Sequence, residues 1–146
     1  MNQAILPTGF TITDSDKSDS LARARISDLL DHWNVEQTGK ADNQPLDFYI
    51  RDQDGEVIGG LVGRTSLGVL FINYFFLPVS LRRRGTGSEL LRRAEEKARL
   101  RGCHTAMLFT MSIQAPNFYL KHGYTIFGEV PCQPTGNARI FMQKKL

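Results

Sequence analysis

The alternation of hydrophobic and polar residues along the chain predicts a mixture of short strands and helices. Runs rich in β-branched and aromatic residues predict seven strands, at 10–13, 46–50, 57–62, 69–77, 105–110, 124–130 and 138–144. Apolar residues at helical spacing predict three helices, at 21–33, 88–101 and 114–124. The Asp54-Gly55 pair predicts a tight hairpin between the second and third strands. We therefore expect an α/β protein in which three consecutive antiparallel strands precede the second helix.

The first helix carries an apolar stripe that includes Leu29, Leu30 and Trp33. Such a stripe is more often part of a core than a binding surface, so we expect it to be buried. In the second helix, Leu90, Leu91, Ala94 and Ala98 form the apolar face, and the spacing predicts i,i+4 ion pairs from Glu89 to Arg93 and from Glu95 to Arg99. The polar segment at 35–45 is expected to be a loop.

A basic turn with two glycines follows the strand at 69–77. Pro78 cannot donate to a strand ladder, so it should end regular pairing and let the strand diverge. Gly85 and Gly87 allow a ligand to approach the backbone closely, and the helix that begins near Ser88 adds unpaired N–H groups. Arg82-Arg83-Arg84 supply the positive charge that suits phosphate. The turn is therefore a candidate anion site.

Two common phosphate motifs are excluded by the sequence itself. The segment at 85–90 lacks the third glycine of the dinucleotide fingerprint, and no G-x-x-x-x-G-K-[ST] occurs in the chain. By itself, Arg82-x-x-Gly85-x-Gly87 is as consistent with an ordinary surface turn as with a phosphate site.

A second segment, Ser-Ile-Gln-Ala-Pro-Asn-Phe-Tyr-Leu-Lys-His-Gly-Tyr at 112–124, changes this balance. Together with Arg82-x-x-Gly85-x-Gly87, it resembles the GNAT superfamily of acyl-CoA-dependent N-acetyltransferases. In that family, an R/Q-x-x-G-x-G/A turn after the fourth strand holds the cofactor pyrophosphate. A later helix with F-Y-x-x-x-G-[FY] lines the pantetheine and thioester end. The likeness covers roughly residues 47–130.

The resemblance implies a single domain, 1–146, of the α+β type, with a central, mostly antiparallel mixed sheet flanked by helices. It implies acetyl-CoA as cofactor, an amine as acceptor, and direct attack in a ternary complex. Tyr119 would be catalytic, giving a proton to the departing thiolate. The residues implied to bind the cofactor are Phe76, Leu77, Val79, Arg82, Arg83, Arg84, Gly85, Thr86, Gly87, Ser88, Ser112, Ala115 and Phe118.

Two positions depart from the family pattern. Arg83 stands where the family often has Gly, so we expect that this peptide does not easily adopt a conformation reserved for glycine. Ser112 stands where the family often has Asn, which bears on one cofactor contact.

Asn73 lies where some relatives carry an acidic residue, and an amide cannot accept a proton at neutral pH. A water chain is the first candidate for the base, followed by Glu129 or a carboxylate of the first helix.

The charge of the chain is unevenly distributed. Residues 1–73 carry 6 Lys+Arg and 11 Asp+Glu, a net −5, whereas residues 74–146 carry 12 and 4, a net +8. The basic half suits a polyanionic cofactor, and the acidic half suits a cationic acceptor such as a polyamine or an aminoglycoside-type amino sugar. The alternatives are solvated faces that merely differ in charge, or an acceptor that is a protein N-terminus or lysine. Residues expected to contact the acceptor are Asp28, Asp31, Trp33, Glu36 and Asn73.

The sequence disfavours several other classes of protein. The basic residues lie largely on one helix mixed with glutamates, which does not indicate nucleic-acid binding. No apolar run approaches the ~20 residues of a membrane span, and residues 1–10 lack signal-peptide features, so we expect a cytoplasmic protein without a membrane partner. The two cysteines and three histidines have no metal-ligand spacing, so no metal is expected. A homodimer is common in the family.

A protein of a different class also fits these motifs, namely a catalytically silent acyl-CoA-binding domain that acts as a sensor or regulator. A domain that only binds has no need of a proton donor at the thioester end. Tyr119 therefore favours the enzyme.

Overall fold

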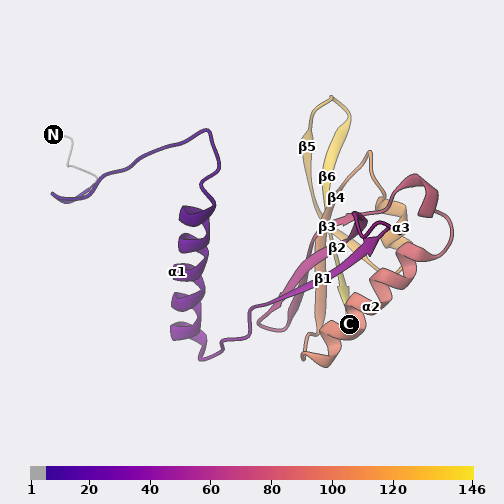
Figure 1. Ribbon diagram of the computed structural model, residues 1–146, viewed down its shortest axis with the longest axis horizontal. Coiled ribbons are helices and arrows are strands. Elements are labelled where there is room, and N and C mark those ends of the chain that lie inside the picture. Colours follow the sequence, from indigo (N-terminus) through magenta and orange to yellow (C-terminus); the bar gives the residue numbers. More distant parts are fainter. Residues whose placement is uncertain (1–5) are drawn as a thin grey trace. The chain divides into compact units, whose positions relative to one another are not determined.

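The computed structural model describes residues 6–146, and their contacts divide the chain into two units, 1–41 and 42–146. The first unit contains one helix, α1 (Ser20–Thr38), and the second contains a six-stranded sheet with helices (Figure 1). That residues 1–146 form a single domain stays a prediction.

Local hydrogen bonds define both ends of α1. At its start, Ala22 N donates to the Asp19 carboxylate at 3.0 Å, which is an N-cap bond. At its end, Gly39 adopts a left-handed φ of 71° and its N–H donates to Val35 O at 2.8 Å. The helix predicted at 21–33 is therefore confirmed, but residues 35–38 are helical rather than part of a loop.

The prediction of a strand at residues 10–13 of the first unit is wrong. Residues 10–13 form no strand, and Phe10 and Ile12 are 68% and 75% exposed. A strand requires a neighbour for its backbone groups, and this unit offers none in the part that the structure describes. No residue of α1 is buried within its own unit, so the burial of its apolar stripe stays a prediction. A single helix has no second apolar layer within its own unit.

The second unit is built on a mixed sheet in the order β1-β2-β3-β4-β6-β5. Its β3 and β4 strands are parallel to each other, and the other neighbours are antiparallel, which confirms the predicted sheet. The strands are β1 (Gln44–Arg51), β2 (Val57–Ser66), β3 (Val69–Phe76), β4 (Thr105–Met111), β5 (Thr125–Cys132) and β6 (Asn137–Lys145).

The hairpin between β1 and β2 forms as predicted. The Asp52 carboxylate accepts hydrogen bonds from Asp54 N at 2.9 Å and Glu56 N at 3.0 Å, and Gly55 adopts a φ of 81°. A carboxylate that bonds the following backbone, together with a left-handed glycine, stabilises a tight turn. The turn lies at the same end of the sheet as the end of β3, because Gly60 of β2 pairs with Phe76.

Two helices, α2 (Thr86–Leu100) and α3 (Pro116–Lys121), lie on one side of this sheet (Figure 1). The inward face of α2 buries Leu91, Ala94 and Ala98. These side chains join a core that includes Leu61, Leu70, Ala106, Tyr119, Tyr124 and Met142. A short 3-10 turn, Val79–Leu81, connects β3 to the segment before α2.

One predicted ion pair of α2 is confirmed and the other is wrong. Arg93 Nε donates to Glu89 Oε1 at 2.7 Å, as predicted. Glu95, however, is only 4% exposed and receives two bonds from Lys144 Nζ, at 2.8 and 2.7 Å, instead of pairing with Arg99. Glu95 adjoins Ala94 on the buried face of α2, so its carboxylate reaches β6 rather than solvent. A buried charge requires such a partner.

Candidate active site

The strands β3 and β4 diverge before β3 ends. Their parallel pairing stops at Ile72 and Leu108, although β3 continues to Phe76. Asn73 is also skipped in the register between β3 and β2, which marks a bulge that bends the strand. The divergence therefore begins at Asn73 rather than at Pro78 as predicted. It leaves the last residues of β3 without a ladder on the β4 side.

The backbone just after β3 is partly occupied. Leu77 O accepts a hydrogen bond from Arg82 Nε at 2.9 Å, and Val79 O accepts one from Arg82 N at 3.2 Å. Phe76 pairs with Gly60 of β2. The carbonyl groups of Leu77 and Val79 are therefore not free for a ligand. The N–H groups of Leu77 and Val79 have no acceptor among residues 6–146.

The basic turn ends in unpaired backbone donors. Gly85 is the N-cap of α2 with a φ of 81°, and the first helical bond runs from Glu89 N to Gly85 O at 3.0 Å. The N–H groups of Thr86, Gly87 and Ser88 precede that bond and have no acceptor within the helix. Unpaired N–H groups at the positive end of a helix dipole form an arrangement that binds anions.

Arg83 adopts a backbone conformation that was not expected for it. Its φ is 59°, in the left-handed region, so the residue takes the conformation that a glycine would take there. A left-handed conformation costs a non-glycine residue about 1–2 kcal/mol. Arg83 and Arg84 are both exposed, so their guanidinium groups are available to an anion at the turn.

The turn packs directly against the helix that carries the predicted proton donor. A Cβ added to Gly87 would lie 3.2 Å from Leu77 Cδ1 and 3.3 Å from Phe118 Cζ. Gly85, in contrast, has nothing within 4 Å of an added Cβ. Gly87 is therefore required for contact between α2 and α3, and Gly85 for the turn conformation.

Tyr119 lies in a cluster of aromatic rings beside the diverging end of β3. Its ring centroid is 5.2 Å from Phe118, 5.7 Å from Tyr124 and 6.4 Å from Phe75 of β3. The side chain is 7% exposed, and burial raises the pKa of its phenol to about 12. Tyr119 therefore keeps its proton at neutral pH, as a general acid must.

The two remaining predicted cofactor residues have structural positions of their own. Ser112 Oγ donates to Asn137 Oδ1 at 3.1 Å and accepts from Ala138 N at 3.0 Å, so it joins the end of β4 to β6. Ala115 is the N-cap residue of α3 and is exposed. Contact of either residue with the cofactor stays a prediction.

The predicted acceptor residues belong to different units of the chain. Asn73 is exposed at the bulge of β3, whereas Asp28, Asp31, Trp33 and Glu36 lie on α1 in the other unit. At about 100° per residue, Asp31 and Trp33 point in directions about 200° apart. Trp33 belongs to the apolar stripe, and Asp28 and Asp31 lie opposite it. Contact of these four side chains with the acceptor stays a prediction.

His122 is a residue of this region that the sequence did not single out. Its Nε2 is 2.9 Å from Ser88 Oγ in the basic turn, and its Nδ1 is 2.7 Å from Phe118 O. The sequence indicated only an isolated histidine, because Ser88 lies far away along the chain. Only the packing of α3 against α2 brings the two residues together.

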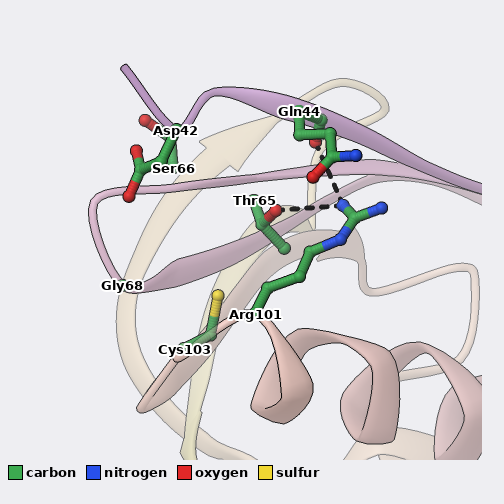
Figure 2. A pocket seen from close by; sticks show the side chains of 7 residues that line it. All are labelled: Asp42, Gln44, Thr65, Ser66, Gly68, Arg101 and Cys103. Atoms are coloured by element: carbon green, nitrogen blue, oxygen red, sulfur yellow. Dashed lines mark hydrogen bonds between the residues drawn. The ribbon is translucent and has the colours of Figure 1, made fainter. Parts of the chain in front are cut away.

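A pocket of about 230 Å³ lies at the opposite end of α2 (Figure 2). Arg101, the C-cap of α2, reaches across it and donates to Pro45 O at 2.9 Å and Thr65 Oγ1 at 3.0 Å. The 15 residues of α2 rise by about 22 Å, so this pocket is remote from the basic turn. One guanidinium nitrogen of Arg101, Nη1, makes these bonds, which hold the end of α2 to β1 and β2.

The described residues, 6–146, offer neither a membrane-spanning helix nor a metal cluster. No helix in this range is long and apolar enough to cross a membrane. No group of three or more His, Cys, Asp or Glu side chains in it could hold a metal ion.

The comparisons with known proteins agree with this geometry. The model of the acetyltransferase (GNAT) family matches residues 12–124, so the chain belongs to the GNAT family of acetyltransferases. An acetyltransferase of Agrobacterium fabrum is 36% identical over 131 residues, which cover 90% of this chain and 96% of that protein. Blasticidin-S acetyltransferase of Streptomyces morookaense is 32% identical over 116 residues, covering 77% and 85%.

A solved structure extends the likeness to three dimensions. The crystal structure of an acetyltransferase from Agrobacterium tumefaciens superimposes with a TM-score of 0.83 at 34% identity, covering 94% of this chain and all of that one. The α+β fold and the enzyme class expected from the sequence are thereby confirmed.

Proposed function

We propose that this GNAT acetyltransferase transfers an acetyl group from acetyl-CoA to the primary amine of a small cationic molecule. The observation that supports this most is the convergence of three features at one end of the sheet. The diverging end of β3, the basic turn and Tyr119 are joined there through the contacts of Phe75 and Gly87 with α3. Acetyl-CoA is the donor that acetyltransferases of this family use.

The residues of the turn fit the pyrophosphate of such a donor. The N–H groups of residues 86–88 converge at the helix start, and Arg83 and Arg84 add positive charge. Arg82 has a different role, because its Nε is bonded to Leu77 O and holds the turn against the end of β3. Its remaining guanidinium N–H groups are still able to reach a phosphate.

The chemistry at the thioester end of acetyl-CoA needs two groups of the protein. The acceptor nitrogen attacks the thioester carbon directly, the C–S bond breaks, and the amine loses a proton. The N–H of Leu77 donates to the oxygen on which negative charge develops. Tyr119 gives its proton to the departing thiolate. Because both substrates are present together, no acetyl-enzyme forms.

No side chain described near β3 is well placed to act as the base. Asn73 is an amide, and Glu129 lies on β5, which is separated from β3 by β4 and β6. At about 4.8 Å per strand, this places the axes of β3 and β5 roughly 14 Å apart, too far for direct proton transfer. We therefore propose that water carries the proton away from the amine.

A small cationic acceptor is favoured by charge and by one relative. The relative named blasticidin-S acetyltransferase supports a small molecule rather than a protein. Among the carboxylates of the β1–β2 hairpin, Asp47 and Asp52 accept hydrogen bonds from the chain itself, for example from Gly63 N and Glu56 N. Asp54 and Glu56 are exposed at the turn, at the active-site end of the sheet. They are added to the acidic residues of α1 as candidates for attracting a cation.

The test is a screen for release of CoA thiol from acetyl-CoA with amines that differ in charge. The panel contains spermidine, an aminoglycoside, blasticidin S, a lysine-containing peptide, and neutral and acidic amino compounds as controls. We expect turnover with a cationic small molecule, and an acceptor KM that rises with ionic strength, because salt screens rim charges. Acetylation restricted to neutral or acidic amines would contradict the proposal, and so would preference for the peptide.

A further inference from the structure

His122 connects the two parts of the proposed site. Its half-buried ring lies 4.5 Å from the ring of Phe118, centroid to centroid. One ring nitrogen contacts Ser88 Oγ in the first turn of α2, and the other contacts Phe118 O in α3. The basic turn and the helix that carries Tyr119 are therefore bridged by a group that can change its charge.

The two contacts determine which nitrogen carries the hydrogen when the ring is neutral. A carbonyl oxygen can only accept, so Nδ1 carries a hydrogen and donates it to Phe118 O at 2.7 Å. In the neutral ring, Nε2 then has a lone pair and accepts. Ser88 must donate its hydroxyl hydrogen to Nε2, at an Oγ–Nε2 distance of 2.9 Å. In this state the Ser88 hydroxyl cannot donate to an anion at the turn.

Addition of one proton from solvent reverses this hydrogen bond. A protonated Nε2 donates to Ser88 Oγ, which releases the hydroxyl hydrogen of Ser88. That hydrogen is then free to point to an anion beside the N–H groups of residues 86–88. The anion in turn stabilises the positive ring. By linkage, the protein with the anion bound holds this proton more tightly than the free protein.

We propose that His122 is a proton-linked positioning residue. Binding of a pyrophosphate at residues 82–88 is coupled to protonation of His122, which turns the Ser88 hydroxyl into a donor to that pyrophosphate. This rests on the proposed function, because it assumes that the turn binds the cofactor pyrophosphate.

The charged groups on the surrounding elements are mostly engaged with one another. On α2, Arg92 bonds to Glu89 at 2.9 Å and to Glu96 at 2.8 Å. Glu95 is held by Lys144 of β6, whose Cε would be 3.6 Å from a Cβ on Gly123. Arg93 of α2 bonds Glu89, and Arg82 of the turn bonds Leu77 O through its Nε. The other charged groups of these elements are exposed, namely Lys121 beside His122, Arg83 and Arg84 of the turn, Lys97 and Arg99 of α2, and Arg139 and Lys145 of β6. Binding of a pyrophosphate at the turn would therefore be the event that adds charge beside Ser88.

Proton uptake on binding is measured by titration calorimetry in buffers of different ionisation enthalpy. The probe is dephospho-CoA, which keeps the pyrophosphate but lacks the phosphomonoester, whose own second pKa of about 6 would take up or release protons. Titrations at about pH 6, 7 and 8 span the range in which histidines change charge. We expect uptake of a fraction of a proton, at most one, and an affinity that falls by up to about tenfold per pH unit where the linkage is full.

Two variants separate this role from a structural one. His122→Asn keeps a side-chain amide that can donate to Phe118 O but cannot be protonated, so proton uptake should disappear. The matched control is His104→Asn. His104 is an exposed histidine whose Nδ1 contacts Thr105 Oγ1, remote from the turn, and its loss should leave the uptake unchanged.

A second measurement on the unaltered protein does not depend on whether the variants fold. Nitrogen-15 NMR of the histidine rings should show His122 with hydrogen on Nδ1 in the free protein at high pH. It should show the doubly protonated ring after dephospho-CoA is added at neutral pH, while His104 does not respond.

The outcomes distinguish this inference from the proposed function. If dephospho-CoA and acetyl-CoA do not bind at all, the cofactor site itself is wrong and the inference is overturned with it. If dephospho-CoA binds without proton uptake, or with uptake unchanged in His122→Asn, the cofactor site stands and only the role of His122 is overturned.

Discussion

Gly87 of the basic turn lies against the ring of Phe118, so closely that a side chain at this position would crowd the ring. A Cβ on Gly87 would be 3.3 Å from Phe118 Cζ, which is tighter than ordinary van der Waals contact. Phe118 precedes Tyr119 in α3, so the turn that is proposed to hold phosphate also supports the helix that carries the proposed acid. Changes at either residue should therefore affect both binding and chemistry.

Substitutions of the two glycines should have different effects. Gly87→Ala pushes the turn away from Phe118 and Leu77, and overpacking of this kind costs about 1–3 kcal/mol. Gly85→Ala meets no neighbouring atom, and its cost comes from the left-handed backbone, about 1–2 kcal/mol. Urea unfolding measures both losses, and calorimetry measures the affinity for acetyl-CoA. We expect weaker acetyl-CoA binding in both variants, with reduced turnover at saturating acetyl-CoA only in Gly87→Ala. Full turnover in Gly87→Ala would show that the contact with Phe118 is not needed.

The left-handed conformation of Arg83 can be tested with a pair of variants that remove the same charge. Arg83→Gly relieves the left-handed cost of about 1–2 kcal/mol but adds freedom to the unfolded chain, which costs about 0.5–1 kcal/mol. Arg83→Ala keeps the conformational cost. We expect the glycine variant to be more stable than the alanine variant by roughly 0.5–1 kcal/mol in urea unfolding, and both to bind acetyl-CoA equally weakly. Greater stability of the alanine variant would show that this position is not left-handed in solution.

Tyr119 and Tyr124 form a matched pair of buried phenols with different expected roles. Tyr119→Phe removes the proposed acid, so kcat should fall by about 10²–10⁴-fold, with a smaller change in acetyl-CoA affinity. The hydroxyl of Tyr124 is buried and has no hydrogen-bond partner among the described residues. Tyr124→Phe should therefore leave kcat nearly unchanged and leave stability unchanged or raised. Equal kcat values for the two variants would contradict the assignment of Tyr119.

The raised pKa of Tyr119 also predicts a dependence of stability on alkaline pH. Burial raises the pKa from its ordinary value of 10 to about 12, so the folded protein favours the protonated phenol. The stabilisation is complete below pH 10 and is lost as the pH rises toward about 12. In Tyr119→Phe, the loss of stability across this interval should be smaller than in the unaltered protein, as measured by urea unfolding at each pH. An identical alkaline loss would show that Tyr119 is not buried.

The buried pair of Glu95 and Lys144 should be strongly coupled. Lys144→Met leaves the Glu95 carboxylate buried without a partner, which typically costs about 3–5 kcal/mol. The double variant Glu95→Gln with Lys144→Met should recover much of that loss. The exposed pair of Glu89 and Arg93, on the same helix, serves as the control and should show a far smaller coupling. Equal coupling energies for the two pairs would indicate that Glu95 is solvated.

The sequence predicted the elements whose pattern is local. The Asp54-Gly55 hairpin and the amphipathic face of α2 are confirmed, because turn chemistry and helical periodicity act within a few residues. It did not predict contacts that depend on packing between distant segments. The Glu95–Lys144 pair and the Ser88–His122 contact each join residues far apart in the chain. The strand expected at 10–13 failed for a related reason, since a strand exists only where a neighbour is available.

The same distinction applies to the candidate site. The glycines of the turn and Tyr119 were predicted from motifs, and the structure places Gly87 and Tyr119 on either side of Phe118 in contact with it. The divergence of β3 from β4 at Asn73 was not predicted at its correct position, because it follows from a bulge against β2. The left-handed Arg83 was not predicted either, because propensity disfavours it and only the geometry of the turn requires it.

The proposed reaction is direct acetyl transfer to a small amine in a complex of both substrates with the protein. The most direct test is a matrix of initial rates over acetyl-CoA and the best cationic amine, combined with intact mass spectrometry of product and protein. We predict intersecting double-reciprocal lines, an amine heavier by one acetyl group, and a protein of unchanged mass. Parallel lines with an acetylated protein, or loss of the acetyl group without any acetylated amine, would contradict the account.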